Sequence, residues 1–144
     1  MAKFEFNKIG KIIAINLKPG DLLLESINAE LADSGVKNAV LVSALGSLCK
    51  LEYHVIGATT REPKDLFRSV EAPVELGVMQ GMVLNGVPHI HLVASTPDGR
   101  VHIGHLEPGC IVQYLMEMTF IEIEDMNLQR VADEYGIGYL KEIE

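Results

Sequence analysis

Compact turn signals divide the second half of the chain into short apolar segments, and this pattern constrains the fold most. Asn85-Gly86 is a strong two-residue hairpin signal, and Pro97-Asp98-Gly99 suits a three-residue loop that ends with glycine in the left-handed region. Pro108-Gly109 marks a third turn. The segments between these turns predict strands over 74–84, 88–95, 100–106 and 111–123. Successive strands joined by such short turns pair antiparallel.

The first half of the chain adds a helix to this sheet. Residues 11–18 are rich in β-branched side chains and predict a strand, and Asp21 is a candidate N-cap for a helix through about Asp33. Apolar side chains at a spacing of four give that helix one apolar face. Further expectations are strands over 38–44 and 48–56, a polar loop over 59–68, and a short helix or irregular segment over 128–135. The pattern predicts an α+β fold, a mostly antiparallel sheet with one main packed helix.

Length and charge narrow the class of protein. The 144 residues suit a single domain over 1–144, and 48% apolar residues supply a core and hint at self-association. A net charge of −8 repels phosphate backbones, so DNA is an unfavoured partner. Two cysteines, Cys49 and Cys110, exclude a disulfide framework. With no signal peptide and no apolar run long enough to cross a membrane, we expect a cytoplasmic protein without a membrane partner.

Histidines are concentrated in one region, because four of the five lie between positions 89 and 105. His89 and His91 are two apart, so on a strand both side chains point to the same face with Cα atoms roughly 6.6 Å apart. Two imidazoles at that separation can converge on one ion. His54 lies far from this group in the sequence, and nothing in the sequence assigns it a partner.

The turns decide which histidine joins this pair. With a three-residue loop at 97–99, His91 lies opposite His105, and Glu107 lies beside the pair opposite His89. The tight turn at 85–86 places Gln80 opposite His91. A two-residue loop would instead bring His102 to this face, because a shift of one residue reverses the side-chain faces. The chemistry of proline and glycine in the loop favours the first register.

Three imidazoles on one face predict a metal site made by His89, His91 and His105, with Gln80 and Glu107 adjacent. Zinc binds histidine nitrogen at about 2.0–2.1 Å, and three protein ligands leave a position for water or substrate. Another divalent metal is the alternative. Ordinary strand histidines that only form hydrogen bonds are the simpler interpretation of the same pattern.

Several segments together resemble the PPC (plants and prokaryotes conserved) domain, in its prokaryotic stand-alone form. The resemblance covers roughly residues 10–123. Its His-rich core is the most specific part. The matching segments are Gly86–Leu92, Asp98–Val101, Gly104–Leu106 with Gly109, and upstream Leu17–Leu23, Ala44–Ser47 and Met116–Met118.

This resemblance implies an antiparallel sheet with a packed helix, a homotrimer, and a metal commonly taken as zinc on three histidines, which correspond here to His89, His91 and His105. The fold is also similar to that of acetolactate decarboxylase, a zinc enzyme with three histidine ligands. Family members are often labelled DNA-binding, but the chain has no Arg-Gly-Arg-Pro motif for reading the minor groove.

Three functional hypotheses follow. The first is a metal-binding protein that acts on or senses a small oxygen-rich metabolite; as an enzyme it would be a zinc-dependent lyase or hydrolase, with Glu117 as the candidate catalytic proton carrier. The second is a DNA-binding, transcription-associated protein. The third is a trimer in which the metal is purely structural.

Overall fold

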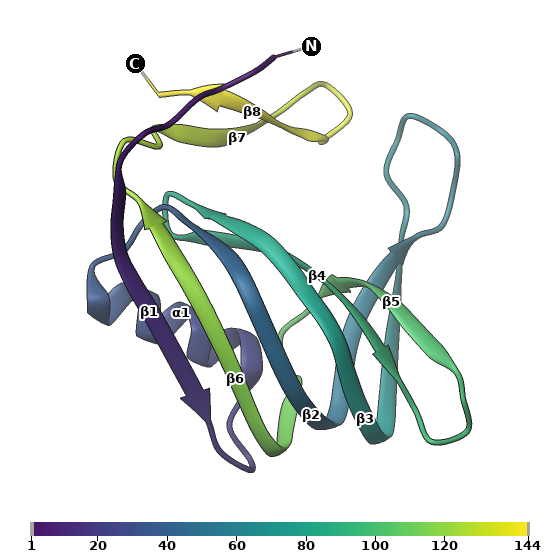
Figure 1. Cartoon of the computed structure of the whole chain (residues 1–144). Coiled ribbons are helices and arrows are strands. Elements are labelled where there is room, and N and C mark those ends of the chain that lie inside the picture. Colours follow the sequence, from purple (N-terminus) through teal and green to yellow (C-terminus); the bar gives the residue numbers. More distant parts are fainter. Residues whose placement is uncertain (1, 144) are drawn as a thin grey trace.

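Six strands form one antiparallel sheet, and a single helix packs against one of its faces (Figure 1). The computed structural model describes residues 2–143. The strands are β1 (Ile9–Leu17), β2 (Ala39–Ile56), β3 (Asp65–Leu84), β4 (Val87–Ser95), β5 (Val101–Leu106) and β6 (Ile111–Ile123), in the spatial order β1-β6-β2-β3-β4-β5. The predicted α+β class is confirmed.

Strand β2 is longer than the sequence suggested and closes part of the sheet on itself. The strand continues through Gly46, where a turn was expected, so the predicted strands 38–44 and 48–56 are one strand. Gly46 allows this because its φ of +151° is an angle that other residues rarely adopt. Its early residues pair with β6, whereas Tyr53 and His54 pair with Leu106 and His105 of β5. Strands β2, β3, β4 and β5 therefore form a closed ring. The predicted polar loop is also shorter, because β3 begins at Asp65.

Helix α1 (Leu23–Ser34) buries the predicted apolar face, formed by Leu23, Ile27 and Leu31. The predicted N-cap is wrong: the Asp21 carboxylate accepts a hydrogen bond from the backbone N–H of Lys18 at 2.8 Å, before the helix begins. The short Lys18–Asp21 turn draws that carboxylate back to the strand end, away from the first helical turn. Within residues 2–143, no helix has the length and apolar character needed to cross a membrane.

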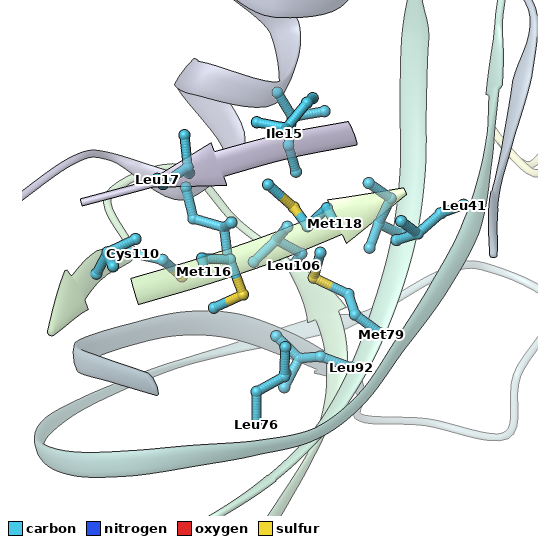
Figure 2. Packing of buried hydrophobic residues seen from close by; sticks show 14 of the residues in the cluster. Ile15, Leu17, Leu41, Leu76, Met79, Leu92, Leu106, Cys110, Met116 and Met118 are labelled. Atoms are coloured by element: carbon cyan, nitrogen blue, oxygen red, sulfur yellow. The ribbon is translucent and has the colours of Figure 1, made fainter. Parts of the chain in front are cut away.

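The main core consists of buried apolar side chains from helix α1 and from all six strands of the large sheet (Figure 2). Alternate residues of β6 point into it, because successive side chains on a strand face opposite sides. Its largest fully buried side chains include Phe120, Met116 and Met118 of β6, together with Leu92 of β4. This rigid packing holds β4, which carries two of the clustered histidines, at a fixed position.

A second, two-stranded sheet follows the large one. Strands β7 (Leu128–Ala132) and β8 (Gly138–Glu142) form a hairpin where the sequence predicted a helix or irregular segment. The turn favours this outcome, because the Asp133 carboxylate accepts hydrogen bonds from the backbone N–H groups of Tyr135 and Ile137, both at 2.9 Å. Leu128 packs with Leu84, Met126 and other apolar side chains in a small separate cluster, which anchors the hairpin beside the large sheet.

Candidate metal centre

Turn chemistry sets the register of β4 and β5 as the sequence predicted. The backbone N–H of Thr96 donates to the carbonyl of Arg100 at 3.0 Å, and Gly99 has a φ of +81°, so the loop contains three residues. His91 therefore lies opposite His105, whereas His102 lies opposite Ala94. The predicted register is confirmed.

The neighbouring turn between β3 and β4 is confirmed as well. Asn85 and Gly86 both have positive φ, 50° and 79°, as a two-residue hairpin turn of this type requires. Gln80 lies opposite His91, and Met82 lies opposite His89. The predicted neighbour Gln80 thus stands beside the clustered histidines.

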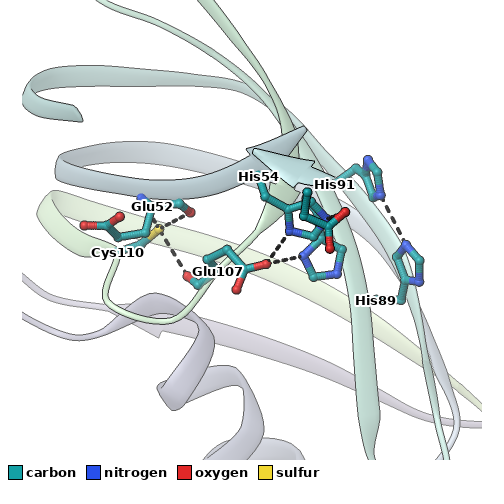
Figure 3. A network of polar contacts seen from close by, with 8 residues as sticks. Glu52, His54, His89, His91, Glu107 and Cys110 are labelled. Atoms are coloured by element: carbon teal, nitrogen blue, oxygen red, sulfur yellow. Dashed lines mark hydrogen bonds and ion pairs between the residues drawn. The ribbon is translucent and has the colours of Figure 1, made fainter. Parts of the chain in front are cut away.

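The imidazole rings of His89, His91 and His105 lie close to one another. Ring centroids are separated by 5.2 Å for His89–His91, 5.0 Å for His89–His105 and 5.5 Å for His91–His105. The Nε2 atoms of His89 and His91 are 3.1 Å apart (Figure 3). A tetrahedral zinc ion with bonds of about 2.0–2.1 Å separates two ligand nitrogens by roughly 3.4 Å. The His89–His91 pair is compatible with a shared ion, but among the described residues the three whose ligand atoms all lie within 4.8 Å of one another are His54, His105 and Glu107.

The surroundings of His89 and His91 favour the neutral form of their rings. Partial loss of hydration, followed by the positive charges of Arg130 and of nearby imidazoles, lowers the pKa of His89 to about 4. Partial loss of hydration is also the main cause that lowers the pKa of His91. His89 is exposed as a residue, but its ring faces the other two imidazoles. Neutral imidazole is the form that binds metal.

A fourth histidine, which the sequence could not place, completes the cluster. The ring of His54 stacks on that of His105 with centroids 4.6 Å apart. The Glu107 carboxylate lies 2.6 Å from Nδ1 of His54 and 3.0 Å from Nδ1 of His105 (Figure 3). Ligand atoms of these three residues all lie within 4.8 Å of one another. His54 also lies 3.7 Å from the Asp65 carboxylate.

Glu107 reaches this position by leaving the β4–β5 ladder. The ladder ends at the His91–His105 pair, and the backbone N–H of Glu107 donates to the carbonyl of Glu52 at 3.0 Å on β2. Glu107 was expected beside the site but opposite His89; its contacts are instead with His54 and His105. The pairing of β2 with β5 has no local sequence signal, and only a prediction of that long-range register could have found His54.

An open pocket of about 530 Å³ borders the cluster. His89 and His91 line it together with Gln80, which places the predicted neighbour at its wall. Arg130 of β7 and Leu140 of β8 also line the pocket, so the hairpin that follows the large sheet contributes to the same space.

Two candidates from the sequence lie elsewhere. His102 has its Nδ1 3.1 Å from the hydroxyl of Tyr53, away from the other clustered histidines. Glu117 is exposed on β6 and lines a separate cavity of about 280 Å³ with Asn16 and Ser43. The described residues do not bring Glu117 to the pocket of His89 and His91, and its role as a proton carrier stays a prediction.

Solved structures with the same fold cover nearly the whole chain. A metal-containing protein of Archaeoglobus fulgidus is 24% identical with a TM-score of 0.84, and the match covers 99% of this chain and 100% of that one. A plant- and prokaryote-conserved protein of Pyrococcus horikoshii is 22% identical with a TM-score of 0.81, covering 100% and 99%. A candidate DNA-binding protein of Bacteroides thetaiotaomicron is 16% identical with a TM-score of 0.78, covering 95% and 96%. These likenesses show the fold.

Comparison of sequences identifies the family. Two bifunctional GlmU proteins from Synechococcus strains are 24% and 23% identical over 131 residues, but the chain spans only a fifth of the length of these curated relatives. The sequence model of the Plants and Prokaryotes Conserved (PCC) domain, abbreviated PPC above, matches residues 4–124. That match takes in all six strands of the large sheet, the helix and the clustered histidines. The chain therefore belongs to the Plants and Prokaryotes Conserved domain family.

Proposed function

We propose that this PPC-domain protein binds a divalent metal, zinc foremost, through His89, His91 and His105. The observation that carries the proposal is the mutual approach of the three rings, with centroids 5.0–5.5 Å apart on one face of the sheet. The lowered pKa of His89 supports it, because a neutral imidazole need not lose a proton to bind a metal. Three protein ligands leave room for one further ligand.

Glu107 supports the ligand role of His105. Its carboxylate accepts a hydrogen bond from Nδ1 of His105 at 3.0 Å and another from Nδ1 of His54 at 2.6 Å. A carboxylate that holds the Nδ1 proton leaves Nε2 free for a metal and fixes the ring orientation. We therefore assign Glu107 and His54 the role of positioning residues, although the three together also offer an alternative ligand set.

The bound metal would supply a Lewis acid for a small oxygen-rich molecule. The residues of the chain would select and orient that molecule. Gln80 lines the pocket beside His91, and its amide can donate a hydrogen bond to a ligand oxygen. The pocket volume of about 530 Å³ falls within the range of small-molecule sites.

We further propose a homotrimer. Support comes from exposed apolar side chains on neighbouring strands: Val42 is 53% exposed and Leu45 50% on β2, and Tyr114 is 73% exposed on β6. Water contact with such a group of apolar side chains is unfavourable, and burial in an interface between copies removes it.

Metal content tests the metal proposal and its alternative ligand set. The native protein is expected to retain about one zinc per chain after dialysis, measured by elemental analysis. His89→Gln is expected to lose that zinc, whereas His54→Gln keeps most of it with weakened affinity. His102→Gln is the matched control, since His102 lies opposite Ala94 and bonds Tyr53.

The opposite pattern of zinc loss would assign the metal to the alternative ligand set. Zinc lost in His54→Gln but retained in His89→Gln would assign it to His54, His105 and Glu107. Native protein without any metal after growth in zinc-supplemented medium would refute both ligand sets.

DNA binding is the second candidate, favoured by names alone: the neighbours from Bacteroides thetaiotaomicron and Ralstonia eutropha are candidate DNA-binding proteins. The net charge of −8 opposes it. We expect no retention of the purified protein on duplex DNA at low salt. Retention that falls steeply as salt rises would reverse this assignment.

A further inference from the structure

The β7–β8 hairpin lies beyond the residues that match the family, which end at 124, yet it contributes to the histidine pocket. In Figure 1 it lies across one end of the large sheet. Leu128 and Leu140 pack with Leu84 and Met126, so the hairpin is held at that end by apolar contacts. Its residue Arg130 lines the same pocket as His89 and His91.

Arg130 is a partly buried cation that forms no ion pair with the residues that the structure describes. Its side chain loses hydration, which lowers its pKa, and guanidinium still stays charged at neutral pH. Among residues 2–143, no carboxylate lies within ion-pair distance of Arg130. By contrast, the exposed Arg100 pairs with Asp98 at 2.7 Å. A partly desolvated charge that lacks a partner is unfavourable, and an anion in the pocket would remove that cost.

The other polar groups that line the pocket are of a different kind. His89 and His91 contribute imidazoles and Gln80 contributes an amide, and none of the other lining residues is a lysine, aspartate or glutamate. The Arg130 guanidinium thus suits an anionic group, and the imidazoles and the amide suit a neutral or metal-bound oxygen.

We propose that this pocket binds a small carboxylate that carries a hydroxyl or keto oxygen on the adjacent carbon. Its carboxylate pairs with the Arg130 guanidinium, which is shaped for two parallel hydrogen bonds to such a group. Its second oxygen faces His89 and His91. This inference rests on the proposed metal site, which would bind that oxygen, but the Arg130 contact belongs to the hairpin alone.

Glycolate, acetate and glycolamide are suitable probes, because acetate lacks the hydroxyl and glycolamide lacks the charge. NMR titration of the zinc-loaded full chain gives the dissociation constants. We expect glycolate to bind at least about tenfold more tightly than glycolamide, the effect of one charge-assisted hydrogen-bonded pair. Acetate is expected to bind more weakly than glycolate.

Variants assign the charge preference to one residue. Arg130→Gln is expected to bind glycolate no better than glycolamide, and Arg130→Lys to recover part of the difference. Lys141→Gln is the matched control, since it removes one positive charge from an exposed position of the same hairpin. Thermal unfolding of each variant checks that the hairpin still folds.

The outcomes separate this inference from the metal site. If the wild type shows no preference for glycolate while zinc is retained, or if Arg130→Gln keeps the wild-type preference, the anion inference is wrong and the metal site stands. If the wild type retains no zinc but its metal-free form shows a glycolate preference that Arg130→Gln abolishes, the metal proposal fails and the anion contact stands. A preference that survives in Arg130→Gln but not in Lys141→Gln would also overturn the inference.

Discussion

His89 illustrates how a single residue can be prepared for metal by its neighbours. Partial burial of its ring is the main reason that its pKa falls to about 4, and the positive charges of Arg130 and of the neighbouring imidazoles add to the shift. A proton on any one of these rings would also repel a bound cation. The same crowding that destabilises a proton therefore leaves nitrogen lone pairs available.

This shift predicts an acid-dependent stability of the metal-free protein. The pKa of His89 is lower in the folded chain than its ordinary value of 6.5, so the unfolded chain takes up the proton more readily. The stabilising contribution is present above about pH 6.5 and is lost as the pH falls toward 4. Denaturant unfolding at pH 7.5 and 4.5 measures it.

A substitution of His89 shows how much of this pH dependence comes from that residue. His89→Gln is expected to reduce the difference in unfolding free energy between the two pH values, whereas His102→Gln leaves the difference unchanged. Equal pH dependence in the wild type and His89→Gln would contradict the assignment.

At the scale of the element, the turns explain what the sequence could predict. Asn85-Gly86 and Pro97-Asp98-Gly99 fix their hairpins by local backbone preference, so the positions opposite His91 follow directly. His54 could not be predicted, because its partner strand is distant in the sequence. The position of Arg130 could not be predicted either, because the segment that contains it was expected to be helical or irregular. The available signal for a hairpin was its turn, which Asp133 and Gly136 form.

Gly104 tests the pairing of β2 with β5. A Cβ at this position would collide with the backbone carbonyl of His54, and backbone cannot move aside as a flexible side chain can. Gly104→Ala is therefore expected to lower the free energy of unfolding by about 1–3 kcal/mol, the usual effect of overpacking. It should also weaken zinc binding, because it displaces His54 from His105.

Gly138→Ala is the control for Gly104→Ala. Its Cβ would meet Arg130 at an ordinary 3.4 Å. Denaturant unfolding and zinc titration are measured on both variants. Unchanged stability and zinc affinity in Gly104→Ala would mean that the strands can separate there without consequence.

At the scale of the whole molecule, the exposed apolar side chains of β2 and β6 support the proposed assembly of several copies. The large sheet, its single helix and the family membership are established by the fold and the sequence match. The homotrimer, the similarity to acetolactate decarboxylase and the single domain over residues 1–144 stay predictions.

Leu45→Asp tests the assembly. Leu45 is half exposed on β2, and a charge there would be buried at an interface between copies. Light scattering is expected to give three chain masses for the wild type and one for the variant. Lys50→Asp, a charge change farther along the same strand, is the control. A wild-type protein that is monomeric at micromolar concentration would refute the proposed homotrimer.

The hydrogen bond between His54 and the Glu107 carboxylate joins positions 53 apart in the chain. Closing so long a loop loses much more entropy than forming the three-residue turn between β4 and β5. During refolding, we expect the hairpin with His91 and His105 to form early and the contact with His54 to form late. A nascent chain would then acquire metal affinity in two stages, the weaker one before the strand ring closes.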